Sequence, residues 1–159
     1  MGRRLEQMEW DDRTLGERER AHIESLDHFQ MASVGEGGWP YVQFRGGPKG
    51  FLRVLGPQLL GFADFRGNRQ YISTGNVDND DRVSLLLLDQ AHRTRLKIFA
   101  RAEVRDVDDE LRGLLVDPTY EAVVERAFLF HVEAVDWNCP QHITPRFSVE
   151  EWNRAARDR

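Results

Sequence analysis

Residues 82–104 read RVSLLLLDQAHRTRLKIFARAEV, and this stretch decides the fold class of the chain. Arg82 to Asp89 is strongly β-type and apolar on both faces, which is typical of a strand inside a sheet. Thr94 to Val107 alternates between apolar and polar positions, as a long strand with one buried face does. The stretch therefore predicts a protein built mainly from β-strands.

Further short strands precede and follow this stretch, with glycine and proline turns between them. They are predicted at 29–34, 39–45, 51–55, 59–65 and 127–137. Pro40 restricts its strand to an edge of the sheet, unless the proline stands at the strand's start. Short strands separated by turn residues at regular spacing favour a barrel or a sandwich.

Helices are predicted on both sides of the strands. Thr14 and Glu17 have the spacing of a capping box, so a helix is expected from there to about residue 27 or 28, with Ile23 and Leu26 toward the core. Three more helices are expected: one over 69–74 that ends at Gly75-Asn76, one over 108–126 that is interrupted at Asp117-Pro118, and a terminal one that begins with the capping box of Ser148 and Glu151.

The composition suits one domain of 159 residues, with 1–28 as an N-terminal helical region and 137–159 as a C-terminal tail and short helix. The net charge of -5 argues against a general nucleic-acid binder, because such proteins usually carry a basic surplus.

Cys139 is the single cysteine, so no intramolecular disulfide can form. With no signal-peptide pattern and no apolar run near the roughly 20 residues that span a bilayer, we expect a cytoplasmic protein outside the membrane.

The first candidate site is the junction Phe65-Arg66-Gly67-Asn68-Arg69-Gln70, where a predicted strand runs into a turn and a helix start. Free backbone N–H groups at a helix N-terminus attract phosphate, and two arginines strengthen that attraction. The alternative is an ordinary strand–turn–helix junction with solvated arginines.

Two more segments offer binding chemistry. Arg95 and Lys97 point to the same face of a strand, because side chains alternate with period two, and two cations there suit an anion pocket. Gly46 to Arg53 contains a glycine-rich bend that lets the backbone approach a flat ligand. The alternatives are a solvent-facing strand and a plain hairpin turn.

The segment Trp137 to Arg146 is dense in polar and aromatic groups and has no apolar periodicity. Cys139 and His142 are too few for a closed zinc site, so no metal is expected. Nothing in the sequence brings these two together as a nucleophilic pair. We interpret the segment as a rim that closes over a ligand or a neighbouring subunit.

Taken in order, several of these segments resemble the FMN-binding split barrel of the pyridoxamine 5'-phosphate oxidase superfamily. They are Phe51 to Leu55, Phe62 to Gln70, Arg82 to Leu87 and Arg95 to Ala102. The similarity spans about residues 29–107, with 137–146 as a subgroup-like tail. It implies a mainly β fold with flanking helices, a homodimer with FMN at the subunit interface, and a small-molecule substrate.

The resemblance also implies which residues bind FMN. The strand Phe51 to Val54 would line the flavin ring, and the next strand would end near the ring at Ala63-Asp64. Arg69-Gln70 would hold the phosphate. The C-terminal segment of the other chain would complete the pocket. The candidates are Phe51, Leu52, Arg53, Val54, Ala63, Asp64, Arg69, Gln70, Arg95, Lys97, Trp137, Gln141, His142 and Arg146.

The chain departs from the oxidases in two places. Gln70 stands where they carry lysine, so Arg53, Arg69 or Lys97 must supply the missing phosphate charge. The Arg-Leu pair of their C-terminal substrate-binding pattern is not evident. The resemblance therefore leaves the substrate open.

Our hypothesis is an FMN-dependent oxidoreductase whose catalytic residues the sequence does not identify. FMN needs cations for its phosphate, hydrogen-bond partners for its ribityl chain and flat apolar walls for its ring, while the flavin carries the redox chemistry. The alternatives are a non-catalytic flavin carrier or sensor, a deazaflavin-binding protein, a haem-binding split barrel with His131 or His142 on the iron, and a ligand-free dimeric scaffold.

Replacing Arg69 with alanine tests the phosphate turn. Arg69→Ala should weaken FMN binding by one charge-assisted contact, on the order of 1.5–3 kcal/mol. A fluorescence titration of the purified variant with FMN measures this loss. An unchanged affinity would put the phosphate elsewhere.

Overall fold

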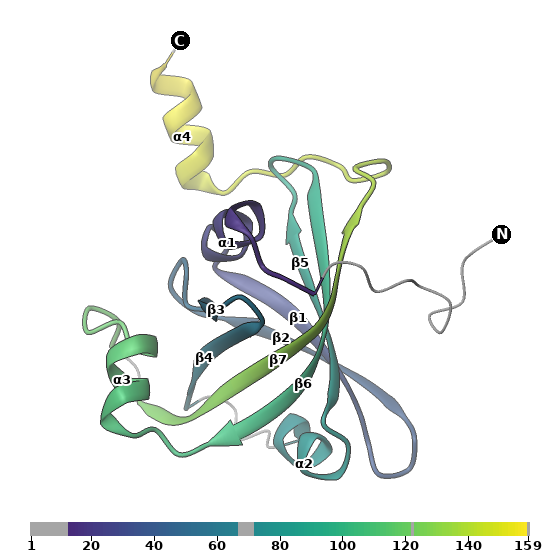
Figure 1. Ribbon diagram of the computed structural model, residues 1–159. Helices are drawn as coiled ribbons and strands as arrows, with labels where there is room; N and C mark the ends of the chain where they lie inside the picture. The colour runs from purple at the N-terminus through teal and green to yellow at the C-terminus, as the bar shows by residue number, and fades with distance from the viewer. Residues whose placement is uncertain (1–12, 67–71, 122, 159) are drawn as a thin grey trace, which may run out of the picture.

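The computed structural model describes residues 13–66, 72–121 and 123–158. Within these ranges the strands form one antiparallel sheet in the order β2-β1-β5-β6-β7-β4-β3 (Figure 1). The strands are β1 (His28–Val34), β2 (Pro40–Gly46), β3 (Arg53–Gly56), β4 (Leu59–Phe65), β5 (Arg82–Asp89), β6 (Thr94–Arg105) and β7 (Val124–Asn138). The helices are α1 (Glu17–Glu24), α2 (Ile72–Asn79), α3 (Asp109–Leu115) and α4 (Val149–Arg157). The prediction of a mainly β fold with flanking helices is confirmed.

The longest strands of this sheet, β6 and β7, form its central antiparallel pair. Its register runs from Arg95 opposite Asn138 to Arg105 opposite Ala127, with a bulge between Phe99 and Ala100. β5 lies between β1 and β6, which is the internal position that its apolar sequence predicts. The sheet curls in Figure 1, so one face of it encloses a core and the other faces outward.

Phenylalanine rings fill the inside of the curl. Phe62 of β4 lies at their centre, with ring centroids 5.2 Å from Phe128, 5.5 Å from Phe29, 5.8 Å from Phe130 and 5.9 Å from Phe51. All five rings are at most 5% exposed. Burying such a side chain contributes about 1.5–3 kcal/mol, so this cluster is a main stabilising element of the fold.

A second, smaller core lies on the other side of β4 and β7. There α3 packs Leu111 and Leu115 against Ala63, Ala127 and Leu129. Asp108 caps this helix, because its side chain accepts a hydrogen bond from the backbone N–H of Leu111 at 2.8 Å. β4 is therefore covered on both faces.

The helix α1 begins two residues later than the prediction. Its N-cap is Gly16, whose backbone N–H donates to the carboxylate of Glu19 at 3.0 Å, so the predicted pair of Thr14 and Glu17 does not form the cap. Ile23 and Leu26 face the core as predicted, and they are 0% and 9% exposed.

The prediction that Gly75-Asn76 ends a helix was wrong, because both residues lie inside α2. Side-chain hydrogen bonds to two strands stabilise the helical conformation at these residues. Ser73 donates from its hydroxyl to Gln43 of β2 at 2.5 Å, and Asn76 donates from its side chain to Ser33 of β1 at 3.0 Å. Residues 69–71 of the predicted helix lie outside the described residues.

The prediction of helix as far as Arg126 was also wrong. α3 ends at Leu115, and β7 begins at Val124 because this stretch pairs with β4, with Val124 opposite Phe65. The capping box of Ser148 and Glu151 begins α4 as predicted, with hydrogen bonds of 3.1 and 2.7 Å. None of the described helices has the length and apolarity to cross a membrane.

His22 of α1 provides a pH-dependent contact with the sheet. Its Nε2–H donates to the carbonyl of Leu87 at 3.1 Å, and Nδ1 lies 3.4 Å from the hydroxyl of Thr94. Burial lowers the pKa of His22, although the hydrogen bond to Leu87 and the charge of Asp89 oppose that shift. The unfolded chain, with a histidine pKa of about 6.5, therefore takes up a proton before the folded chain does.

The free energy of unfolding should consequently fall as the pH drops through about 6.5, until folded His22 itself becomes protonated. Urea denaturation of the wild type and of His22→Gln at about pH 7.5 and about pH 5.5 measures the difference. His131→Gln is the control, since His131 is exposed on β7. The same pH dependence in His22→Gln and the wild type would contradict this role.

Candidate functional site

One end of the β4–β7 ladder carries a partly buried cluster of charges. Asp64 of β4 accepts a hydrogen bond from Arg45 of β2 at 2.9 Å, and Arg126 of β7 lies 3.9 Å away. The side chains of Arg45 and Asp64 are only 12% and 13% exposed. The guanidinium of Arg45 also stacks over the rings of Phe62 and Phe128, at 5.7 and 5.2 Å from their centroids. The cluster thus caps one end of the phenylalanine core.

Burial away from water shifts the pKa values of the ionisable groups in this cluster. Burial raises the pKa of Asp64, and the charges of Arg45 and Arg126 oppose that rise. Burial lowers the pKa of Arg45, and Asp64 opposes that fall. A guanidinium stays protonated at neutral pH all the same. Two guanidinium groups therefore surround one carboxylate where β4 ends.

The predicted cofactor residues of β3 pair with the beginning of β4 and not with its Asp64 end, and few residues of this group present a side chain to a ligand. Phe51, Leu52 and Val54 are buried in the main core and Ala63 in the smaller one, so only their backbone atoms could reach a cofactor. Arg53 is exposed on β3. The predicted phosphate residues Arg69 and Gln70 lie outside the described residues.

A second group of predicted residues lies at the other end of β6. Arg95 and Lys97 share the outward face of this strand. Arg95 donates to the carbonyl of Cys139 at 3.2 Å, and Arg93 donates to the carbonyl of Pro140 at 3.3 Å. The two arginines fasten the start of the C-terminal segment to the β5–β6 turn. Gln141, His142 and Arg146 follow on this segment and are all exposed.

Two buried polar atoms at this end have no hydrogen-bond partner among the described residues. They are Nε of Arg95 and the side-chain oxygen of Asn138, which stand directly opposite each other on β6 and β7. An unsatisfied buried polar group costs about 1–3 kcal/mol.

The side chain of Trp137 contacts three residues of its own chain. Its indole N–H donates to the carboxylate of Glu19 at 2.6 Å, the guanidinium of Arg18 lies 4.0 Å from its ring, and its edge packs on His22. Although burial pushes the pKa of Glu19 upward, hydrogen bonds from Trp137 and Gly16 bring it below its ordinary value. The tryptophan thereby attaches α1 to β7, and a role toward FMN stays a prediction.

Asp64 and Arg95, one from each group of predicted residues, lie toward opposite ends of the β6–β7 ladder. Arg95 pairs with Asn138 at one end, and Arg105 pairs with Ala127, the neighbour of Arg126, at the other. At about 3.3 Å per residue, the ten steps from Arg95 to Arg105 extend roughly 30 Å along the strand. Asp64 and Arg95 of one chain are therefore far apart along the ladder.

The sequence interpretation did not include Arg45 and Arg126. Arg126 comes to Asp64 through the pairing of β7 with β4. Arg45 comes there through the curl of the sheet, because β2 and β4 stand almost at opposite ends of the strand order. No local spacing in the sequence signals such a contact. In the described ranges no group of histidine, cysteine and acidic side chains could hold a metal ion.

The sequence profile of the pyridoxamine 5'-phosphate oxidase family matches residues 15–152. The comparison with curated proteins gives no match. Solved structures with the same fold include a candidate pyridoxamine 5'-phosphate oxidase from Lactobacillus delbrueckii, at 20% identity and a TM-score of 0.60, over 79% of this chain and 96% of that one.

Two further structures differ in what their names say they bind. An FMN-binding protein from Syntrophomonas wolfei is 14% identical, with a TM-score of 0.54, over 76% of this chain and 83% of that one. The haem storage protein HutZ from Vibrio cholerae is 15% identical, with a TM-score of 0.54, over 77% of this chain and 94% of that one. At these identities the likeness shows the fold alone, and the predicted split barrel is confirmed.

Replacing Arg45 tests the charge cluster. Arg45→Met leaves the carboxylate of Asp64 with only the more distant Arg126, so the free energy of unfolding should fall by about 3 kcal/mol. Urea denaturation measures this loss. The control is Arg66→Met, because the pair of Arg66 and Glu125 is solvent-exposed on its arginine side and should contribute less than about 1 kcal/mol. Equal losses in the two variants would contradict a structural role for Arg45.

Proposed function

Because the chain belongs to the pyridoxamine 5'-phosphate oxidase family, we propose that it binds FMN between two copies of itself and works as a flavin-dependent oxidoreductase. The partner in this proposal is a second identical chain, and the substrate is a small molecule. The family match covers the strands that hold both groups of predicted cofactor residues.

The observation that carries the proposal is the separation of these two groups. One spans β3 and the end of β4, and the other lies where β6 begins. From this separation we do not expect a single chain to use both on one FMN. Two chains related by a two-fold axis can, because each supplies its β4 end to one site and its β6 end to the other. The dimer would then hold two equivalent sites.

The residues present fit an FMN molecule. Arg53 and Arg69 of one chain, with Lys97 of the other, would provide the charge that the phosphate needs. Arg95, on the outward face of β6, would face a polar edge of the cofactor. The exposed Gln141 and His142 would close the site from the partner's tail. When bound, FMN supplies the capacity to accept and donate hydride or electrons.

The absorbance spectrum of the purified protein tests the cofactor. Flavin bands, with the mass of FMN released on heating, are the expected result. A Soret band would move the assignment to haem, and the mass of a deazaflavin would replace FMN. A colourless protein that also fails to bind added FMN would overturn the proposal. Bound flavin without turnover of any electron donor would favour a carrier or a sensor.

Mixing two defective variants tests the shared site. Arg69→Ala and Arg95→Ala should each bind FMN weakly as homodimers, because every site then lacks one contact. Unfolding and refolding an equal mixture should restore roughly a quarter of the sites, since half of the dimers are mixed and each mixed dimer has one intact site. Flavin content after gel filtration measures this. No recovery in a mixture of confirmed dimers would show that both residues act within one chain.

A further inference from the structure

The edge strand β2 carries large apolar side chains on its outward face. None of its residues is buried, and Val42 and Phe44 are 64% and 63% exposed. Trp39, which directly precedes the strand, is 81% exposed. In Figure 1 the hairpin of β1 and β2 extends away from the other strands. An exposed apolar edge strand favours association with another chain unless something covers it.

This apolar surface continues from β2 across the two neighbouring strands. Phe44 stands opposite Gln30 of β1, and Gln30 stands opposite Leu86 of β5. In the adjacent row Val42 stands opposite Ala32 of β1. Side chains that are paired in this way emerge on the same face of the sheet. Ala32 and Leu86 are only partly buried, so part of this surface stays accessible in the single chain.

The row of Phe44 leads to the proposed cofactor residues. It runs through Gln30 and Leu86 to Lys97 of β6, which shares the outward face of that strand with Arg95. At about 4.8 Å between strands, three spacings or roughly 15 Å separate Phe44 from Lys97. A stable interface covers about 800 Å² on each partner, a patch roughly 30 Å across. A second chain that completes the FMN site at Lys97 therefore also reaches β2.

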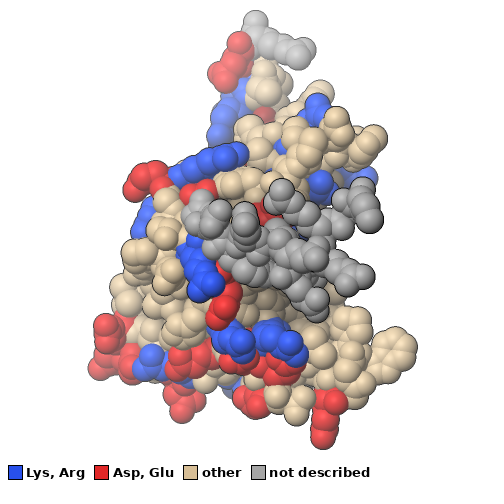
Figure 2. All heavy atoms as spheres, turned by 45° about the vertical axis from the view of Figure 1, so that its right-hand side comes forward, with Lys and Arg blue, Asp and Glu red and all other residues tan. Residues whose placement is uncertain are grey.

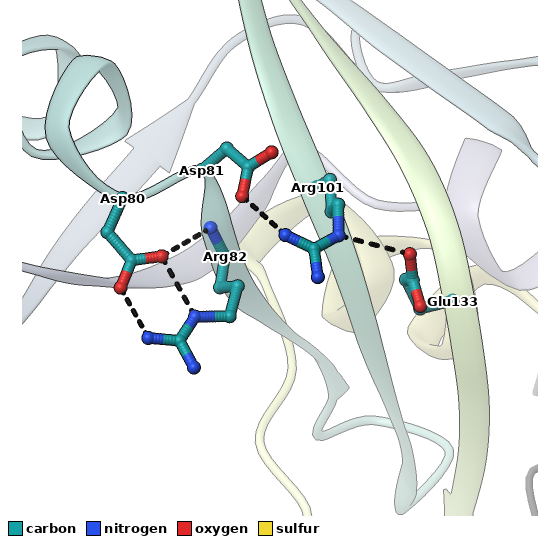
Figure 3. Close-up of polar contacts among 5 residues, drawn as sticks. All are labelled: Asp80, Asp81, Arg82, Arg101 and Glu133. Atoms are coloured by element: carbon teal, nitrogen blue, oxygen red, sulfur yellow. Dashed lines mark hydrogen bonds and ion pairs between the residues drawn. The ribbon is translucent and has the colours of Figure 1, made fainter.

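Paired charges border this surface. Figure 2 shows acidic and basic side chains close together along the lower part of its view. Figure 3 shows one such group at the beginning of β5. There Asp80 accepts hydrogen bonds of 2.9 and 2.6 Å from the guanidinium of Arg82. Arg101 of β6 donates to Asp81 at 2.7 Å and to Glu133 at 3.3 Å. An apolar centre with charged residues at its border is the usual arrangement of a protein–protein interface.

From this arrangement we propose that a second copy of this chain covers the outward face of β2, β1 and β5, with Val42 and Phe44 as the central contacts. The inference rests on the proposed function, because the copy that covers these strands is the copy that completes the FMN site. The two-fold axis of such a dimer repeats every contact, so each chain covers the apolar surface of the other. The flavin site then forms only when the two faces are in contact.

Analytical ultracentrifugation of the full chain, loaded with FMN and also without it, tests this surface. Phe44→Glu and Val42→Lys should each raise the dissociation constant of the dimer at least about hundredfold, because each variant places two charges in a desolvated interface. The flavin content per chain should fall in parallel, since every site needs both chains.

Trp152→Glu is the matched control, because Trp152 is 65% exposed on α4 and Phe44 is 63% exposed on β2. It should leave both the dimer and the flavin content unchanged. All three variants should keep the circular dichroism spectrum of the wild type, because these side chains are mostly exposed within a single chain. Loss of the dimer in a variant with this spectrum is then a loss of contact and not of folding.

Three results would overturn the inference. They are a wild type that stays monomeric, a dimer that persists unchanged in both β2 variants, and loss of the dimer in Trp152→Glu alone, which would place the second copy on α4. A wild-type dimer that binds no flavin but dissociates in Phe44→Glu would support this surface and contradict the cofactor. A flavin-loaded dimer that neither β2 variant affects would contradict this surface alone.

Discussion

The structure depends on the packing of phenylalanine rings around Phe62. An antiparallel sheet with one apolar face has to cover that face, and here it does so by curling around its own rings. The ring contacts join β1, β4 and β7, which are not neighbours along the chain. Once the sheet curls, β2 comes close to β4, and Arg45 can meet Asp64 and close one end of the core. The ion pair is a consequence of the packing.

Phenylalanine rings fill the inside of the curl among the described residues, so we expect binding chemistry at the ends of the curl or on its outward face. Among the predicted cofactor residues, Arg95 and Lys97 lie on the outward face of β6, where the strand begins. The same packing explains why Phe51 and Leu52 can offer only their backbone to a cofactor. A site shared between chains follows from a fold whose polar residues are placed this far apart.

The strands could be predicted from the sequence because their signal is local. Leu96, Ile98, Ala100 and Ala102 alternate with polar residues, and all four are buried as that alternation predicts. Helix ends were less predictable. Glycine and asparagine are common where helices end. Asn76 nevertheless lies inside α2, because Ser33 of β1 accepts a hydrogen bond from its side chain. Gly16 replaced Thr14 as the cap of α1 because Glu19 reaches its backbone N–H.

The sequence by itself determined the strands, the internal position of β5, the shared face of Arg95 and Lys97 and the capping box of α4, because each depends on the spacing of nearby residues. Only the tertiary structure decided that Arg45 and Arg126 surround Asp64, that Trp137 attaches α1 to β7, and that the predicted cofactor residues divide between two ends. These contacts join residues 19 to 118 positions apart. They depend on the register and curl of the whole sheet, which no local pattern encodes.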